Sequence, residues 1–218
     1  MWRAGPAPRA PAAGRSGALR LGFDFPPGMR VGLYGGSFNP VHDGHAHVAR
    51  TALKRLALDR VIWLVSPQNP LKPVDGTLGL DQRIDDARRY ATGPAMIVSG
   101  IEERLGSRYT IDTVRALKAR FPAVRFVWIM GADNLASFHR WRGWTQIMRE
   151  IPVAIVSRPG DALKSRLSPA ARRFARGRLP ETAARTLADC TPPAWIYLTA
   201  PLNHASSTAL RTGGREKN

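Results

Sequence analysis

Apolar residues along the chain form short continuous runs, and these runs alternate with stretches in which apolar residues recur at helical spacing. Continuous apolar runs are typical of strands that are covered on both faces. Such strands are predicted at residues 30–34, 61–65, 95–99, 124–130, 152–156 and 195–198. Helices are predicted at residues 44–56, 80–90 and 110–121. This alternation predicts an α/β fold with a doubly wound parallel sheet and helices on both faces.

In a sheet of this kind, ligands bind in the crevice outside the carboxyl ends of the strands. The residues that directly follow each strand are therefore the candidates for function. A basic stretch at residues 158–185 follows the fifth strand and is predicted to form a small, solvated helical part near the C-terminal end.

The first 28 residues differ from the rest, being rich in Ala, Pro, Gly and Arg. One interpretation is an Arg-rich, acid-poor transit segment, and the other is a disordered extension ahead of Met29. Pro6, Pro8 and Pro11 fit poorly with an amphipathic targeting helix, which favours a disordered extension. We therefore expect residues 29–218 to form a single domain, and a chain that begins at Met29 to fold and stay active.

The composition is strongly basic, because the chain has 33 Lys and Arg but only 16 Asp and Glu, which gives a net charge of +17. Such a surface attracts nucleotides, nucleic acid or acidic membranes, although a GC-rich genome would produce the same bias. The sequence holds no long apolar run of the kind that spans a membrane. The single cysteine, Cys190, cannot form an internal disulfide, so a cytoplasmic protein is expected.

The segment after the first strand carries the most distinctive chemistry, since residues 35–45 read GGSFNPVHDGH. Glycines let the backbone approach a ligand closely, and the N-terminus of the helix that follows favours phosphate. His42 and His45 could both donate hydrogen bonds to an anion held there. The alternative is that these histidines are surface residues that cap the helix. The segment is neither the G-x-G-x-x-G dinucleotide fingerprint nor a P-loop.

A second segment near the far end, residues 206–211, reads SSTALR. Ser and Thr at a helix N-terminus offer hydroxyls and free amides to phosphate oxygens. Arg211, one turn on, adds a charged fork that suits a β- or γ-phosphate. Taken alone, this segment would be interpreted as an ordinary capped helix.

In this order, the two segments resemble the paired H-x-G-H and I-S-S-T-x-I-R signatures of the nucleotidyltransferase superfamily, whose fold is Rossmann-like. Four further segments resemble the bacterial nicotinate mononucleotide adenylyltransferases. They are PQNPLKP at residues 67–73, RYTIDT at 108–113, GADNLASFHRW at 131–141 and RPG at 158–160. The resemblance runs from about Met29 to Arg211. Departures from the family patterns occur at Leu71, Arg108, Ala205 and Leu210.

The resemblance implies a role for each matched residue. His42 and His45 would be catalytic, holding the ATP phosphates and stabilising the transition state. The implied ATP-binding residues are Gly35, Gly36, Ser37, Phe38, His42, His45, Gly131, Asp133, Ser206, Ser207, Thr208 and Arg211. The implied substrate-binding residues are Asn39, Lys72, Tyr109, Thr110, Trp141 and Arg158. Trp141 would stack on a pyridine ring, whereas Trp144 is expected to lie in the core.

The expected reaction is adenylyl transfer from ATP to nicotinate mononucleotide, giving deamido-NAD and diphosphate. Mg²⁺ is expected to arrive with ATP, without a dedicated protein site. Within the superfamily, the alternative acceptors are nicotinamide mononucleotide and phosphopantetheine. A basic RNA-binding protein is the alternative from another class, but most aromatic residues lie in apolar strands or in the segment around Trp141 and Trp144. No nucleic-acid or membrane partner is expected, and a homo-oligomer is left open.

Overall fold

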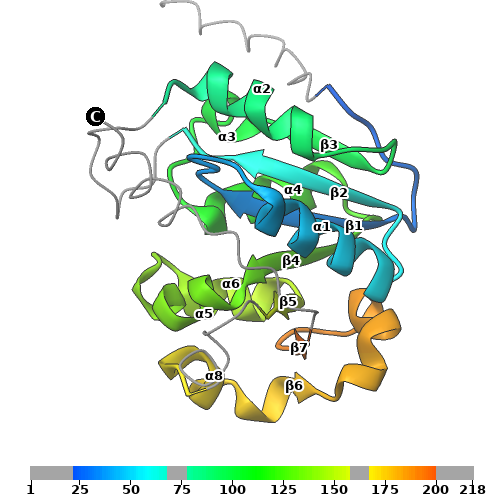
Figure 1. Cartoon of the computed structure of the whole chain (residues 1–218). Helices are drawn as coiled ribbons and strands as arrows, with labels where there is room; N and C mark the ends of the chain where they lie inside the picture. Colours follow the sequence, from blue (N-terminus) through cyan, green and yellow to red (C-terminus); the bar gives the residue numbers. More distant parts are fainter. Residues whose placement is uncertain (1–21, 68–77, 158–166, 200–218) are drawn as a thin grey trace, which may run out of the picture.

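The computed structural model describes residues 22–67, 78–157 and 167–199. Its centre is a seven-stranded sheet in the order β3-β2-β1-β4-β5-β7-β6, in which every strand pair is parallel (Figure 1). The strands are β1 (Arg30–Gly36), β2 (Arg60–Val65), β3 (Met96–Ser99), β4 (Arg125–Gly131), β5 (Val153–Val156), β6 (Arg178–Leu179) and β7 (Trp195–Leu198). The predicted α/β class and parallel sheet are confirmed.

The strand order places a switch point in the middle of the sheet. From β1 the chain winds outward through β2 to β3, and then returns to add β4 on the other side of β1. Tyr34 of β1 pairs with Ile129 of β4, so the two strands end close together at their carboxyl ends. The loops that follow β1 and β4 leave the sheet in opposite winding directions, which opens a crevice suited to a ligand.

Helices cover both faces of the sheet. The α-helices are α1 (Asp43–Arg55), α2 (Leu80–Tyr90), α3 (Ile101–Arg104), α4 (Thr110–Arg120), α5 (Ala132–Ser137), α6 (Trp144–Glu150) and α8 (Pro169–Arg173). The 3-10 helices are η1 (Phe138–Arg140), η2 (Ala175–Gly177) and η3 (Glu181–Asp189). Buried residues of α1, α2 and η3 pack with Trp63 on one face, and those of α4, α6 and α8 pack with Trp128 on the other. None of the helices in the described ranges is both long and apolar enough to cross a membrane.

The basic stretch near the C-terminal end is not the solvated appendage that was expected, at least from residue 167 onward. Phe174 is only 7% exposed, and its ring lies 5.9 Å from that of Trp144. Arg178 pairs with Trp195, which makes the two residues of β6 an edge strand of the sheet. The charged residues occupy the solvent side of this segment, while a few apolar ones fasten it to the core.

The packed structure also begins before Met29. Phe25 is 7% exposed, and its ring lies 5.3 Å from that of Phe121 at the end of α4. Phe23 stacks on Phe25 at 5.2 Å. Residues 22–28, which were assigned to the N-terminal extension, therefore contribute two aromatic rings to the core.

Phe25→Ala should lower the free energy of unfolding by about 3 kcal/mol, because a buried ring is lost and a cavity remains. Catalytic turnover should stay unchanged, since the ring lies against the end of α4 that is remote from the crevice. Urea unfolding of the full chain measures the effect, with Phe23→Ala as the milder comparison at a partly exposed ring. If Phe25→Ala were as stable as the parent, the domain would begin at Met29 as first expected.

Candidate active site

The first half of the site is built where β1 ends. The strand continues through Gly35 and Gly36, two residues beyond its predicted end. A Cβ at Gly35 would lie 2.5 Å from Cη2 of Trp128, which is 1% exposed and cannot easily move. Gly35 is therefore needed for close packing between β1 and the indole of β4, and this contact fixes where the following loop starts.

Phe38 anchors that loop to the core. Its backbone has a φ of 46°, which is uncommon for a residue with a side chain, and its ring is 1% exposed. The ring packs against Trp63 at 5.2 Å and against His45 at 5.1 Å. Phe38 was predicted to bind ATP, and with a buried ring it can do so only through its backbone.

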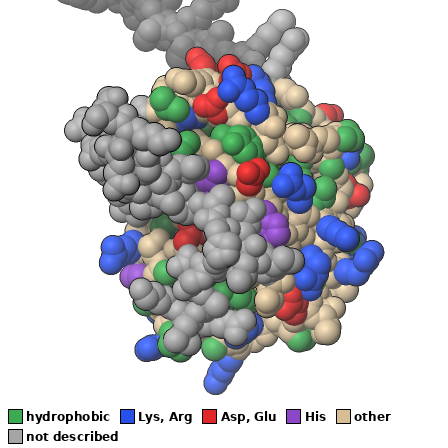
Figure 2. Space-filling model, in the orientation of Figure 1, with side chains coloured by type: hydrophobic (Ala, Val, Ile, Leu, Met, Phe, Trp, Pro, Cys, Tyr) green, Lys and Arg blue, Asp and Glu red, His purple; other side chains and the backbone are tan. Residues whose placement is uncertain are grey.

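His42 and His45 cap the start of α1 reciprocally. The Gly44 N–H donates to Nδ1 of His42 at 3.0 Å, and the His42 N–H donates to Nδ1 of His45 at 3.2 Å. This is the arrangement of a capping box, with imidazoles in place of the usual hydroxyl and carboxylate. The ring centroids lie 3.9 Å apart, and His42 is 2% exposed. Figure 2 shows histidine side chains on the face it draws, near Lys and Arg side chains.

Capping also decides which nitrogen of each ring carries the proton. A nitrogen that accepts a hydrogen bond has no proton, so Nδ1 is the bare nitrogen in both rings. The neutral imidazole then carries its proton on Nε2, which makes Nε2 the donor of each ring. Two such donors at the N-terminus of a helix form an arrangement that suits phosphate oxygens.

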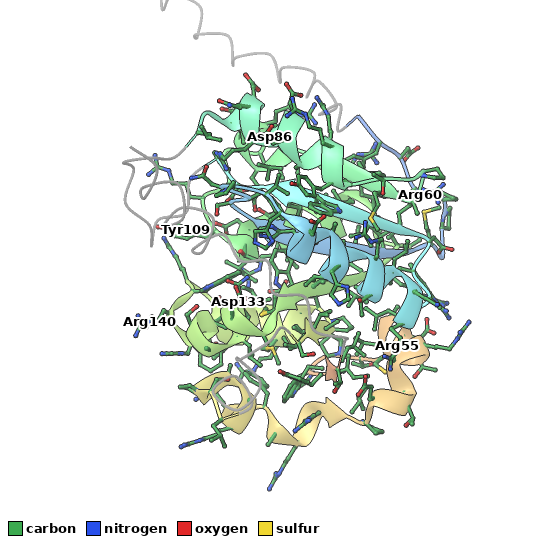
Figure 3. All side chains as sticks on the ribbon, viewed as in Figure 1. Arg55, Arg60, Asp86, Tyr109, Asp133 and Arg140 are labelled. Atoms are coloured by element: carbon green, nitrogen blue, oxygen red, sulfur yellow. The ribbon has the colours of Figure 1, made fainter. Side chains whose placement is uncertain are left out.

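The second half of the site is formed by two segments, one directly after β4 and the other at the start of α4. Gly131 is the last residue of β4 and is buried, and Asp133 lies exposed in the first turn of α5. Tyr109 is the N-cap residue of α4, and Thr110 is its first helical residue. Tyr109 and Asp133 lie on one side of the molecule, and Arg60, at the start of β2, lies on the opposite side (Figure 3).

Aromatic side chains line up beside this half. Trp141 is partly buried, with its ring 6.3 Å from that of Trp128 and 5.3 Å from that of Phe138. The Arg142 guanidinium lies over the Tyr109 ring, 4.5 Å from its centroid. Trp144 packs against the core, as expected for a core anchor. Because Trp128 touches both Gly35 and Trp141, one buried ring connects the two halves of the site.

Several predicted site residues lie outside the described residues. They are Lys72, Arg158, Ser206, Ser207, Thr208 and Arg211. The residues that the structure does bring to the carboxyl ends of β1 and β4 are Gly35, Gly36, Ser37, Phe38, Asn39, His42, His45, Gly131 and Asp133. Among the described residues, no three His, Cys, Asp or Glu side chains are grouped closely enough to hold a metal ion.

Two buried charged residues beside the site were not among the predicted ones. Arg83 on α2 is 1% exposed and bonds to backbone carbonyls around the loop after β1. A sequence signal for it exists, because Arg83 shares the inward face of its helix with Leu80, Ile84 and Ala87. The other residue is Glu102 on α3, which is 7% exposed.

Glu102 belongs to a small polar cluster behind α4. The Thr113 hydroxyl donates to Oε1 of Glu102 at 3.0 Å, and Oγ of Ser107 lies 2.8 Å from Oγ1 of Thr113. Burial raises the pKa of Glu102 to about 7, although the hydrogen bond from Thr113 opposes the shift. The cluster fastens α3 to the first turn of α4, directly behind Tyr109 and Thr110.

A doubly wound parallel sheet with a histidine-capped helix at its switch point defines a nucleotide-binding α/β protein. A family model described as cytidylyltransferase-like matches residues 33–213. The fold also matches a solved structure described as "Plasmodium falciparum nicotinic acid mononucleotide adenylyltransferase complexed with NaAD". That match has a TM-score of 0.61 at 15% identity and covers 84% of this chain and 83% of the other. At this identity the likeness establishes the fold alone.

Curated relatives are much more similar in sequence. A protein of Caulobacter sp. (strain K31), named "Probable nicotinate-nucleotide adenylyltransferase", is 70% identical over 84% of this chain and 97% of its own length. A protein of Methylorubrum extorquens bears the same name and is 55% identical over 84% of this chain and 100% of its own length. The chain therefore belongs to the nicotinate-nucleotide adenylyltransferase family, within the cytidylyltransferase-like proteins.

His45→Ala should lower turnover by about a hundredfold, because one preorganised donor to the reacting phosphates is lost. His45→Glu is the matched variant, since its carboxylate can still accept from the His42 N–H and preserve the cap but offers no donor. Its turnover should fall similarly, while its thermal midpoint stays closer to that of the parent. Steady-state kinetics and thermal unfolding measure both effects, and near-normal turnover in either variant would contradict a catalytic role.

Glu102 should make stability depend on pH. The folded protein binds this proton more tightly than the unfolded chain, so the contribution of Glu102 to the free energy of unfolding falls as the pH rises from 4.5 to about 7. The whole difference amounts to about 3 kcal/mol at most. Glu102→Gln keeps the acceptor for Thr113 but cannot ionise, so it should be more stable than the parent at pH 8. Urea unfolding at pH 5 and 8 tests this, and equal pH dependence in both proteins would contradict it.

Proposed function

We propose that the protein transfers the adenylyl group of ATP to nicotinate mononucleotide and releases diphosphate. The observation that carries the proposal is the pair of imidazoles whose Nε2–H groups stand at the N-terminus of α1, at the switch point of the sheet. The names of the close relatives, and the NaAD bound to the solved Plasmodium falciparum enzyme, support the choice of pyridine nucleotide.

In this proposal, a phosphate oxygen of the mononucleotide attacks the α-phosphorus of ATP, and the bond between that phosphorus and the oxygen of diphosphate breaks. The enzyme supplies no nucleophile, because such transfers require alignment and charge stabilisation. His42 and His45 donate from Nε2 to the phosphate oxygens as charge moves towards the leaving group. The N-terminal amides of α1 add a fixed positive potential.

Mg²⁺ would accompany ATP rather than occupy a dedicated site on the protein. The donor set near the crevice fits this role, since Asp133 is the only predicted site residue with a carboxylate and most ligands would be phosphate and water oxygens. When bound, the ion would neutralise part of the negative charge of the phosphates. Ser207 and Arg211, which lie outside the described residues, are proposed to hold the leaving diphosphate.

The acceptor is proposed to bind across the second half of the site. Trp141 and Tyr109 offer partly buried aromatic faces to the pyridine ring. Thr110 begins α4, and the N-cap residue Tyr109 makes no side-chain hydrogen bond to the first turn. Backbone amides in that turn are donors only, so they suit a carboxylate, which accepts only. A carboxamide would turn its own N–H groups towards the same donors.

We therefore expect kcat/KM for nicotinate mononucleotide to exceed that for nicotinamide mononucleotide by about a hundredfold, because unpaired donors penalise the amide. Diphosphate release from purified protein, ATP and each mononucleotide measures the ratio. His45→Ala serves as the control and should lower both rates in the same proportion. Equal kcat/KM values for the two mononucleotides would refute recognition by donors only. Turnover with ATP and phosphopantetheine, but with neither mononucleotide, would refute the proposed function.

A further inference from the structure

Arg83 is a charged side chain enclosed by protein at 1% exposure. Arginine is rarely buried to this extent unless it is paired, because removing its charge from water is costly. Burial lowers the pKa of Arg83, yet a guanidinium stays protonated. The other arginines at the end of α2, Arg88 and Arg89, form ion pairs at the surface, with Asp85 and Asp86 respectively.

The guanidinium bonds to four backbone carbonyls from three separate segments. Nε donates to Leu78 at 2.9 Å, just before α2. One terminal nitrogen donates to Ser37 at 2.8 Å, in the loop after β1, and to Ser66 at 2.7 Å, after β2. The other terminal nitrogen donates to Pro67 at 2.7 Å. All three guanidinium nitrogens therefore donate to main-chain oxygens.

Further hydrogen bonds join the same three segments. The Ser66 N–H donates to the Gly36 carbonyl at 3.0 Å, and the Ser66 hydroxyl also reaches this carbonyl at 3.3 Å. The Leu78 N–H donates to Oδ1 of Asn39 at 3.3 Å. The loop after β1, the end of β2 and the start of α2 thus form one connected unit with Arg83 at its centre.

The bond to Ser37 also sets the direction of a neighbouring donor. In a trans peptide, the carbonyl of one residue and the N–H of the next point in opposite directions. Because the Ser37 carbonyl points at Arg83, the N–H of Phe38 points away from Arg83. Phe38 can offer a ligand only its backbone, so the direction of this N–H determines whether the loop presents a donor.

We propose that Arg83 is a positioning residue for the triphosphate of ATP, because its guanidinium holds the Ser37–Phe38 peptide in the orientation that presents the Phe38 N–H. The proposal rests on the proposed function for its ligand, and it assigns Arg83 no contact with substrate. Lysine cannot replace it, since an ammonium lacks the planar fork that reaches three segments at once.

The test compares Arg83→Lys and Arg83→Met with Arg88→Lys and Arg88→Met. Arg88 lies on the same helix with its side chain 62% exposed, so its variants control for the substitution itself. ATP affinity is measured by calorimetry, which requires no acceptor and so does not depend on the mononucleotide proposed above. Amide hydrogen exchange is followed at residues 36–39, with β5 as the internal reference.

Arg83→Lys should stay folded at the assay temperature while ATP affinity and kcat each fall by about a hundredfold, as expected for misplaced binding groups. Exchange at residues 36–39 should accelerate, while exchange in β5 and all properties of the Arg88 variants stay at parent values. Should Arg83→Met fail to fold, Arg83→Lys alone decides the question. A lower thermal midpoint with unchanged ATP affinity and unchanged exchange would make Arg83 merely structural and overturn the proposal. Tight ATP binding by the parent without transfer to either mononucleotide would refute the proposed function but leave this proposal standing.

Discussion

The backbone N–H and C=O groups that follow the carboxyl ends of parallel strands have no neighbouring strand to pair with. The surrounding structure depends on which other groups form hydrogen bonds with them. After β1, the carbonyls of Gly36 and Ser37 receive hydrogen bonds from Ser66 and Arg83. A few residues later, N–H groups at the start of α1 donate hydrogen bonds to the imidazoles of His42 and His45. The loop is thus held at one end by donors from α2 and from the residue after β2, and at the other end by acceptors from its own histidines.

The amino and carboxyl ends of the strands are stabilised in different ways. At the amino ends, Asp189 pairs with Arg30 at 2.7 Å and with Arg125 at 2.5 Å, and all three side chains are partly exposed. Exposed pairs of this kind contribute little to stability. At the carboxyl ends, the corresponding contacts are the hydrogen bonds of the buried Arg83 side chain and the packing of Gly35 on Trp128. The contacts that set the position of the loops around the crevice are therefore less exposed to solvent than the ion pairs at the opposite ends of the strands.

Periodicity alone predicted most of the sheet, because β1, β2, β4 and β7 are continuous apolar runs that are buried. It missed β6, since two residues in a basic stretch carry no pattern. For His42 and His45, capping and catalysis were opposing interpretations, but the caps engage only Nδ1 of each ring, so capping is compatible with the proposed role of Nε2 as a donor to phosphate. The bonds of Arg83 could not be predicted, because two of its partners lie 46 and 17 residues away and meet it only through the strand order.

The net charge of +17 and the local chemistry of the crevice act at different ranges. Surface charges attract anions from a distance, but salt screens them within about 8 Å at physiological ionic strength. The proposed donors at the N-termini of α1 and α4 are mostly uncharged, being imidazole Nε2–H groups and helix amides that the fold holds in place. Fixed dipoles need not reorganise when charge moves between phosphate groups. The basic surface can therefore raise the rate at which a nucleotide arrives, whereas the geometry of the loops decides what happens to it afterwards.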